Sequence, residues 1–272
     1  MKEKNFNTNK KLFAIFGNPV SHSKSPLMHN LTFQGLSYPG CYTRYLLEDG
    51  KKLRETFFAL DLKGANITVP HKEHAYRACD HLDAFAQKVG AVNTIVEKEG
   101  KLYGYNTDAP GFLKAISEFD NVKTVLFLGA GGTARSTSAI LRDEGYDVTI
   151  LNRSEGRLQN FKEEGFKTAT FESFEPATFD LIINMTSAGL EDDSLPAPKA
   201  ILDAVIPSAK ACFDVIYGKE TPFLKLAKTY QKSTKDGSDM LLYQGIIAFE
   251  YFTDHQYGFD EIKSYMERAF VL

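Results

Sequence analysis

The sequence predicts an α/β protein of two domains, separated by a cleft and each built on a mostly parallel sheet. Three observations support this: a length of 272 residues, an alternation of short apolar runs with helical patterns, and a glycine cluster directly after one apolar run. Single hydrophobic cores tend to stop growing at about 250 residues, so a chain of this length is expected to divide. Strand–helix alternation favours parallel pairing, since each crossover helix returns the chain to the same edge of the sheet.

The first domain is expected to cover residues 1–109, after a loose polar arm at 1–10. A polar turn follows its first strand, and Ser25 with Pro26 predicts a helix start, serine as the cap and proline in the first turn. Pro70 is expected to end a strand. The expected strands are 12–16, 42–47, 65–69, 91–96 and 101–105, and the expected helices are 25–35, 51–60, 72–79 and 83–89.

The second domain is expected to cover residues 110–237. It should begin with a helix at 111–119, and Thr221 with Pro222 again predicts a helix start. Residues 232–237 are a polar loop by composition. Amphipathic helices at 238–254 and 259–272 are expected to return to the first domain and complete it. The expected strands are 123–128, 148–151, 167–170, 179–184 and 212–217.

Composition and charge point to small-molecule partners. Hydrophobic residues make up 43% and charged residues 25%, and the net charge of −3 comes from interspersed acids and bases, without the basic stripe of a nucleic-acid binder. We expect no nucleic acid and no membrane as partner, because no apolar run approaches the roughly 18 residues of a membrane span. The three cysteines form no C-x-x-C pair, which favours a reducing cytoplasm. A monomer or a homodimer is expected.

The glycine cluster G-A-G-G-T-A at 129–134 predicts a dinucleotide site. It matches G-x-G-x-x-A between an expected strand and an expected helix, which is the context that makes the motif informative. Gly129 permits the tight turn, Gly131 lets the backbone approach a pyrophosphate, and Ala134 lets the helix pack closely on the strand. The second domain is therefore predicted to be Rossmann-like, with Ala130, Gly132 and Thr133 completing the phosphate-binding turn.

The end of the next strand favours NADP over NAD. NAD sites usually carry an acid there for the ribose 2′-hydroxyl, whereas this chain has Asn152, Arg153 and Ser154, with Arg157 one turn later. A guanidinium at this place pairs well with a 2′-phosphate. The alternative is that both arginines belong to an ordinary solvated helix start.

A loop at 184–189 follows the strand predicted at 179–184. Ligands in doubly wound sheets lie outside the carboxyl ends of the strands, so Thr186 and Ser187 are expected beside the nicotinamide half of the cofactor. A simple turn is the alternative.

Hydroxyl, amide and charged side chains in the first domain cluster near the expected strand ends. Ser23 and Ser25, the segment 66–72, Asn93 and the segment 106–108 suit a polyhydroxylated anion. Lys72 is the candidate to stabilise and protonate a developing alkoxide, and Asp108 is its candidate partner. A surface salt bridge is the alternative interpretation of this pair, and the residues alone favour it.

The sequence resembles the shikimate dehydrogenase family along nearly its whole length. The resemblance rests on seven blocks in order: G-x-P-x-x-H-S-x-S-P-x-x-H-N at 17–30, N-I-T-V-P-H-K at 66–72, G-A-V-N-T at 90–94, N-T-D at 106–108, the glycine cluster, N-R-S at 152–154 and M-L-L-Y-Q at 240–244. It implies NADP-dependent, reversible reduction of 3-dehydroshikimate to shikimate in aromatic amino-acid biosynthesis.

The same resemblance assigns roles to individual residues. It implies that Ser23 and Ser25 hold the substrate carboxylate, and that Lys72 carries out the proton chemistry. The substrate hydroxyls would be contacted by Thr68, Asn93, Asp108 and Gln244, and the substrate would also be faced by Tyr217. Gly237 would lie near the nicotinamide. One departure is that 217–222 reads Y-G-K-E-T-P, a residue shorter than the family's usual segment and without its Tyr-Asn-Pro turn.

Three alternatives remain open at this point. The first alternative is an NAD-preferring quinate/shikimate dehydrogenase. The second is another two-domain NADP enzyme, such as a methylenetetrahydrofolate dehydrogenase, and the third is a non-catalytic NADP-binding sensor on the same fold. Arg153 argues against the first. The Ser23/Ser25 and 106–108 blocks together argue against the second, and Lys72 with Asp108 against the third. No metal is expected, because His71 and His74 have no further ligands at suitable spacing.

Overall fold

The computed structural model describes residues 10–272, so most of the arm expected at 1–10 lies outside the described residues. The chain forms two compact units: unit 1 is the chain up to Thr107 together with Gln244–Leu272, and unit 2 is Asp108–Tyr243. The sequence-based boundary after residue 237 assigns the helix that follows to the first domain. The units divide inside that helix, α10 (Ser238–Phe252).

Unit 1 is built on a six-stranded mixed sheet in the order β2-β1-β3-β5-β6-β4. β5 is antiparallel to both of its neighbours, and the other pairings are parallel. The strands are β1 (Lys11–Gly17), β2 (Gly40–Leu46), β3 (Leu62–Ile67), β4 (His81–Leu82), β5 (Thr94–Lys98) and β6 (Lys101–Tyr105). The helices are α1 (Ser25–Gly35), η1 (Gly50–Lys52), α2 (Leu53–Ala59), α3 (Lys72–Ala78), α4 (Ala84–Val89), α11 (Phe259–Met266), η4 (Glu267–Phe270) and the second part of α10.

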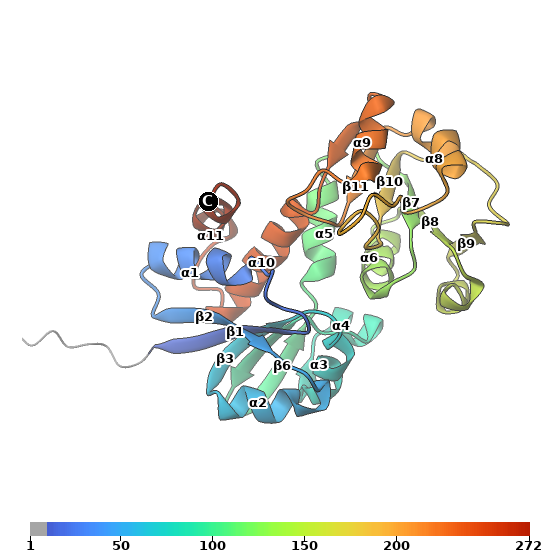
Figure 1. Ribbon diagram of the computed structural model, residues 1–272. Helices are drawn as coiled ribbons and strands as arrows, with labels where there is room; N and C mark the ends of the chain where they lie inside the picture. The colour runs from blue at the N-terminus through green and yellow to red at the C-terminus, as the bar shows by residue number, and fades with distance from the viewer. Residues whose placement is uncertain (1–9) are drawn as a thin grey trace, which may run out of the picture. The chain divides into compact units, whose positions relative to one another are not determined.

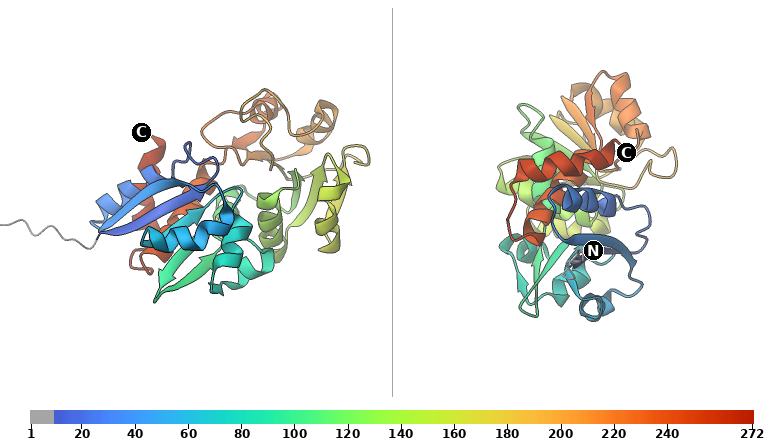
Figure 2. Two further views of the ribbon diagram at one scale, coloured as in Figure 1. Left: turned by 60° about the horizontal axis from the view of Figure 1, so that its bottom comes forward. Right: turned by 90° about the vertical axis from the view of Figure 1, so that its left-hand side faces the viewer.

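Helices cover both faces of this sheet, with α1 and α11 side by side on one face and α2 and α3 on the other (Figures 1 and 2). Strand β1 packs against helices on both faces, because alternate residues of a strand point to opposite faces of the sheet. The Phe13 ring lies 5.0 Å from the rings of Phe33 in α1 and Phe252 in α10. Phe16, three positions further along and so on the opposite face, packs in the cluster that contains Phe57 of α2.

Unit 2 is built on a six-stranded parallel sheet in the order β12-β11-β10-β7-β8-β9. The strands are β7 (Thr124–Leu128), β8 (Asp147–Asn152), β9 (Lys167–Thr170), β10 (Leu181–Asn184), β11 (Ala211–Asp214) and β12 (Ser233–Lys235). The helices are α5 (Asp108–Ile116), α6 (Gly132–Asp143), η2 (Glu155–Arg157), α7 (Gln159–Glu163), α8 (Lys199–Val205), η3 (Ile206–Ser208), α9 (Pro222–Thr229) and the first part of α10.

Strand β7 is central in this sheet and is buried on both faces, which explains its continuous apolar sequence. From β7 the chain proceeds through β8 and β9 to one side, and then returns to β10 on the other. The direction of the strand order therefore reverses between β7 and β10. In doubly wound sheets such a switch point opens a crevice at the carboxyl ends of the two strands.

Several details of the sequence prediction are wrong. Ser25 does not cap α1: the N-cap position is Lys24, and the hydroxyl of Ser23 accepts the Ser25 N–H at 3.2 Å. Strand β11 ends at Asp214 rather than 217, because the Asp214 carboxylate takes the Ile216 N–H out of the ladder at 3.0 Å. The polar loop at 232–237 contains β12, a short edge strand, where one exposed side tolerates polar residues. Helix α5 begins at Asp108 rather than 111.

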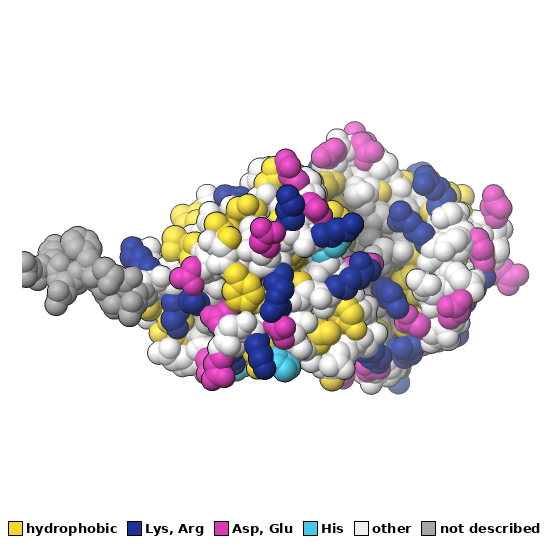
Figure 3. Space-filling view, turned by 90° about the horizontal axis from the view of Figure 1, so that it is seen from below, with side chains coloured by type: hydrophobic (Ala, Val, Ile, Leu, Met, Phe, Trp, Pro, Cys, Tyr) yellow, Lys and Arg dark blue, Asp and Glu magenta, His cyan; other side chains and the backbone are white. Residues whose placement is uncertain are grey.

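Among the described residues, no helix is both long and apolar enough to cross a membrane. Figure 3 shows one face of the molecule, on which basic and acidic side chains are interspersed.

Candidate functional site

The residues proposed for substrate binding in unit 1 gather at the edge of its sheet where the parallel strands have their carboxyl ends. Thr68 follows the end of β3, and 106–107 follow the end of β6. Because β5 is antiparallel to these strands, its first residue lies at the same edge, with Asn66 paired to Thr94 and Thr94 to Tyr105. Asn93 therefore joins Thr68 at this edge although it precedes its strand. The strand that the sequence predicts at 91–96 would contain Asn93, but β5 begins at Thr94.

Ser23 lies in the turn between β1 and α1, Ser25 is the first residue of α1, and both are almost fully buried. Their hydroxyl oxygens are 3.2 Å apart. The turn is held from outside by Arg44 of β2, whose Nε and Nη2 atoms donate to the Ser23 carbonyl at 3.1 and 2.6 Å. Two adjacent hydroxyls at the first turn of an eleven-residue helix form a suitable environment for a carboxylate.

Lys72 is the first residue of α3, and the segment before it is fixed by backbone hydrogen bonds. The Thr68 N–H donates to the Phe16 carbonyl at 2.8 Å, and the His71 N–H donates to the Thr68 carbonyl at 3.0 Å. The Lys72 carbonyl accepts the Val92 N–H at 3.1 Å, which ties α3 to the segment that carries Asn93. The backbone therefore sets the position of Lys72 relative to the same sheet edge.

Asn93 holds the segment that leads to Asp108. Its Oδ1 accepts the Thr107 N–H at 2.7 Å, and its Nδ2 donates to the Thr107 hydroxyl at 3.0 Å. Asp108 then begins α5 and is 9% exposed. Gln244 in α10 is 8% exposed and belongs to unit 1, whereas Asp108 is the first residue of unit 2.

A hydrogen-bonded chain of buried residues supports this edge. Sequence reasoning expects Asn66 near the substrate and misses the supporting role of Tyr42. The Tyr42 hydroxyl donates to Asn66 Oδ1 at 2.7 Å, and Asn66 Nδ2 donates to the Thr94 hydroxyl at 3.1 Å. His29 stacks on Tyr42 with ring centroids 4.4 Å apart, and burial lowers the pKa of His29 to about 3. The signal in the sequence is the H-N pair at 29–30, which composition alone assigns to an ordinary helix face.

In unit 2 the glycine turn lies at the switch point of the sheet. Gly129 follows β7 with a φ of +114°, a backbone angle that residues with a side chain rarely adopt. Its N–H donates to the Leu151 carbonyl at 2.7 Å. A Cβ on Gly129 would lie 2.5 Å from Cγ2 of Thr186, so the loop after β10 packs directly on this turn. Gly131 and Gly132 face open space at the start of α6, whose Ala134 is fully buried. These residues fit a dinucleotide pyrophosphate.

The neighbouring strand β8 places the proposed 2′-phosphate residues at the same edge. Leu128 pairs with Leu151, so Asn152 and Arg153 emerge beside the glycine turn. Asn152 Nδ2 donates to the Ser154 carbonyl at 2.9 Å and closes the turn. The side chains of Arg153 and Arg157 are exposed, as guanidinium groups that bind a phosphate in solvent would be.

A buried carboxylate organises the loops on the other side of the switch point. Asp214 accepts hydrogen bonds from Asn184 Nδ2 at 3.0 Å and from the Thr221 hydroxyl at 2.7 Å, and burial raises its pKa. Asn184 Oδ1 in turn accepts the N–H and hydroxyl of Thr186 at 2.9 and 2.7 Å. Sequence reasoning missed Asp214, which ends an apolar strand and has no motif around it.

Comparisons with known proteins show the family to which the chain belongs. A family model described as the shikimate dehydrogenase substrate binding domain matches residues 15–95. The NADP(+) shikimate dehydrogenase of Helicobacter hepaticus is 43% identical over 248 residues, covering 90% of this chain and 92% of the relative. The chain belongs to the shikimate dehydrogenase family.

Two solved structures extend the likeness to the whole fold. Shikimate dehydrogenase from Aquifex aeolicus superposes with a TM-score of 0.84 at 32% identity, covering 97% of this chain and 98% of that one. Shikimate 5-dehydrogenase from Thermus thermophilus, in complex with NADP(H) and shikimate, superposes with a TM-score of 0.82 at 33% identity, covering 95% and 99%. The α/β fold with a Rossmann-like second unit is thereby confirmed.

Proposed function

We propose that this chain catalyses the NADP-dependent, reversible reduction of 3-dehydroshikimate to shikimate. The observation that carries the proposal is the gathering of Thr68, Lys72 and Asn93 at one sheet edge of unit 1, together with the glycine turn at the switch point of unit 2. The Helicobacter hepaticus relative is a shikimate dehydrogenase (NADP(+)), and the Thermus thermophilus structure holds NADP(H) and shikimate. Most of the proposed substrate residues belong to unit 1, and the proposed cofactor residues belong to unit 2.

Each proposed residue has a defined task. Ser23 and Ser25 would bind the carboxylate, and Thr68, Asn93, Asp108, Tyr217 and Gln244 would contact the remaining substrate groups. Lys72 would donate a proton to the alkoxide oxygen as it forms and take it back in the reverse direction, with Asp108 orienting its ammonium group. Bound NADPH supplies the hydride. Arg153 and Arg157 would select NADP through its 2′-phosphate, while Thr186, Ser187 and Gly237 would border the nicotinamide.

The test is the initial rate of nicotinamide reduction by the purified protein, with shikimate or quinate crossed against NADP or NAD. Activity confined to shikimate with NADP is the expected result. Comparable rates with quinate and NAD would replace the proposal by a quinate/shikimate dehydrogenase, and no rate in any combination would favour a non-catalytic NADP-binding sensor. We further propose that the enzyme works in the cytoplasm, as a monomer or a homodimer.

A further inference from the structure

The loop at 215–221, between β11 and α9, carries Tyr217 and is held at two consecutive points by the segment before α10. The Gly237 N–H donates to the Ile216 carbonyl at 2.9 Å. The Asp236 carboxylate accepts the Gly218 N–H through Oδ2 at 2.8 Å. The residues directly before and after Tyr217 are therefore both bonded to 236–237.

The approach of the two segments is close as well as hydrogen-bonded. A Cβ on Gly237 would lie 2.2 Å from the carbonyl oxygen of Val215, so only glycine lets the backbones meet in this way. Gly218 has a φ of +70°, and it is the residue in the loop with the greatest backbone freedom. The hydrogen bond to Asp236 therefore restrains the loop at Gly218, where its backbone is most flexible.

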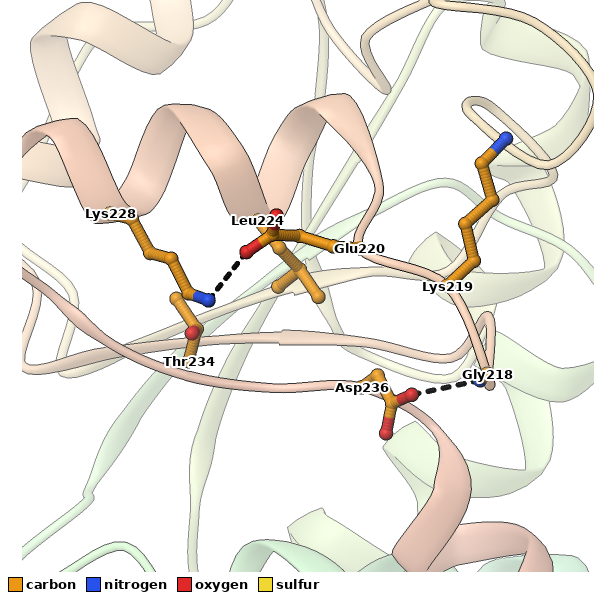
Figure 4. A pocket seen from close by; sticks show the side chains of 7 residues that line it. All are labelled: Gly218, Lys219, Glu220, Leu224, Lys228, Thr234 and Asp236. Carbon is orange, nitrogen blue, oxygen red and sulfur yellow. Dashed lines mark hydrogen bonds and ion pairs between the residues drawn. The ribbon is translucent and has the colours of Figure 1, made fainter. Parts of the chain in front are cut away.

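Figure 4 shows Asp236 on the wall of a pocket of about 290 Å³, with its carboxylate directed at Gly218. The other charged side chains of the pocket are engaged elsewhere. Lys219 extends away and donates to the Leu190 carbonyl at 3.0 Å, and Lys228 pairs with Glu220 at 2.5 Å. Among the side chains drawn in Figure 4, Asp236 is thus the one that links the loop to the segment before α10.

A carboxylate is the group that this position requires. Oδ1 of Asp236 accepts the Ser238 N–H at 3.0 Å, while Oδ2 accepts both the Gly218 N–H and the Ser238 hydroxyl, the latter at 3.1 Å. An amide has one acceptor oxygen, and its NH₂ group would face an N–H donor on the other side. Asp236→Asn is therefore nearly isosteric, yet it loses one of these bonds.

We propose that Asp236 is a positioning residue, which fixes Tyr217 for the substrate by bonding the backbone beside it. The inference rests on the proposed function, because it takes Tyr217 to contact the substrate. Asp236 itself acts through the loop and has no contact with the reacting atoms. Its loss should raise the KM for shikimate more than it lowers kcat, because ordering of the loop would have to accompany substrate binding.

The experiment compares Asp236→Asn with Glu220→Gln in the full-length enzyme. Both exchange a carboxylate for an amide in the same pocket, but Glu220 bonds a lysine side chain rather than the backbone beside Tyr217. We expect Asp236→Asn to raise the KM for shikimate about tenfold, the order expected for one charge-assisted hydrogen bond, and Glu220→Gln to leave it unchanged. Equal effects of the two substitutions would overturn the proposal.

Combination with Tyr217→Ala separates positioning from a general structural role. Tyr217→Ala alone should raise the KM, and adding Asp236→Asn should change it little further, since the positioned side chain is gone. Additive effects, or no effect of Tyr217→Ala, would overturn the proposal.

Hydrogen exchange of the peptide covering 215–221 gives a readout that does not depend on activity. Exchange should be faster in Asp236→Asn than in the wild type and unchanged in Glu220→Gln. Unchanged exchange both in Asp236→Asn and in Asp236→Ala, which has no acceptor oxygen at all, would overturn the hydrogen-bonded link itself. If exchange is faster in Asp236→Asn but the protein does not turn over shikimate, the hydrogen-bonded link exists without a role in catalysis. The proposal would then fail together with the proposed function.

Discussion

At the scale of single residues, many polar side chains near the proposed substrate site are held in place by hydrogen bonds to the protein itself. Asn93 uses both its oxygen and its nitrogen on Thr107, and the Tyr42 hydroxyl bonds Asn66. Buried polar groups need such partners, since an unpaired one costs about 1–3 kcal/mol. A site assembled in this way is rigid before the substrate arrives, which lowers the entropy cost of binding.

Lys72→Ala should lower kcat by about two to four orders of magnitude, the usual range for a positioned acid–base group. Binding of NADP, measured by fluorescence titration, should remain near the wild-type value because Lys72 belongs to unit 1 and the glycine turn to unit 2. Near-normal turnover would remove Lys72 from the mechanism.

Arg153→Ala should raise the KM for NADP about tenfold or more and leave the KM for NAD nearly unchanged, because the loss concerns the 2′-phosphate. Steady-state rates with the two cofactors measure this. Arg77→Ala, on the exposed side of α3 in unit 1, is a suitable control. Equal changes for NAD and NADP would contradict the assignment.

His29 should make stability depend on pH. Burial lowers its pKa to about 3, so the folded protein keeps the imidazole neutral while the unfolded chain protonates it below about 6.5. The free energy of unfolding should then fall by about 1.4 kcal/mol per pH unit as pH drops below 6.5. In His29→Gln the change between pH 7 and pH 5, from urea unfolding, should be smaller by about 2 kcal/mol. An identical pH dependence would contradict this reason.

At the scale of elements, a side chain pairs with backbone groups of β2, the strand at the lateral edge of the unit 1 sheet. Asn30 in α1 donates from Nδ2 to the Tyr42 carbonyl at 2.8 Å and accepts the Tyr42 N–H at 2.9 Å through Oδ1. The Asn30 side chain therefore makes the two hydrogen bonds that a residue of a further strand would make to the edge strand β2. The same two bonds fix α1, and with it the serine turn, to the sheet.

Asn30→Ala should destabilise the protein by about 2–4 kcal/mol, because it leaves both backbone groups of the buried Tyr42 unpaired. Gln34→Ala, an exposed position on the same helix, should change stability by less than about 0.5 kcal/mol. Urea unfolding measures both. A loss no greater than in Gln34→Ala would show that the edge strand does not need this side chain.

At the scale of the whole molecule, the two units have separate cores and separate sheets, so their ligands should protect different segments. In hydrogen exchange, NADP should slow 129–134 and 152–157 in unit 2, whereas shikimate should slow 20–25 and 66–72 in unit 1. NAD at the same concentration is the control for the effect of the 2′-phosphate. Protection of the unit 1 segments by NADP alone would contradict this division of roles.

The sequence by itself determined the features that depend on neighbours along the chain. The α/β alternation, the strand that precedes Gly129, the helix at Ser25–Gly35 and the order of the seven blocks could all be recognised, because periodicity and turn chemistry are local. The roles of Ser23, Lys72 and Asn93 depend on the resemblance carried by these blocks, and they stay predictions.

Only the tertiary structure decided which distant residues meet. The antiparallel course of β5 brings Asn93 to the edge with Thr68, and the packing of Thr186 on Gly129 joins two loops more than fifty residues apart in sequence. Asp214 and Asp236 are ordinary acids in the sequence, and their importance lies in backbone groups that other elements present to them. Hydrogen bonds and packing between segments depend on three-dimensional position, and a one-dimensional pattern contains no record of it.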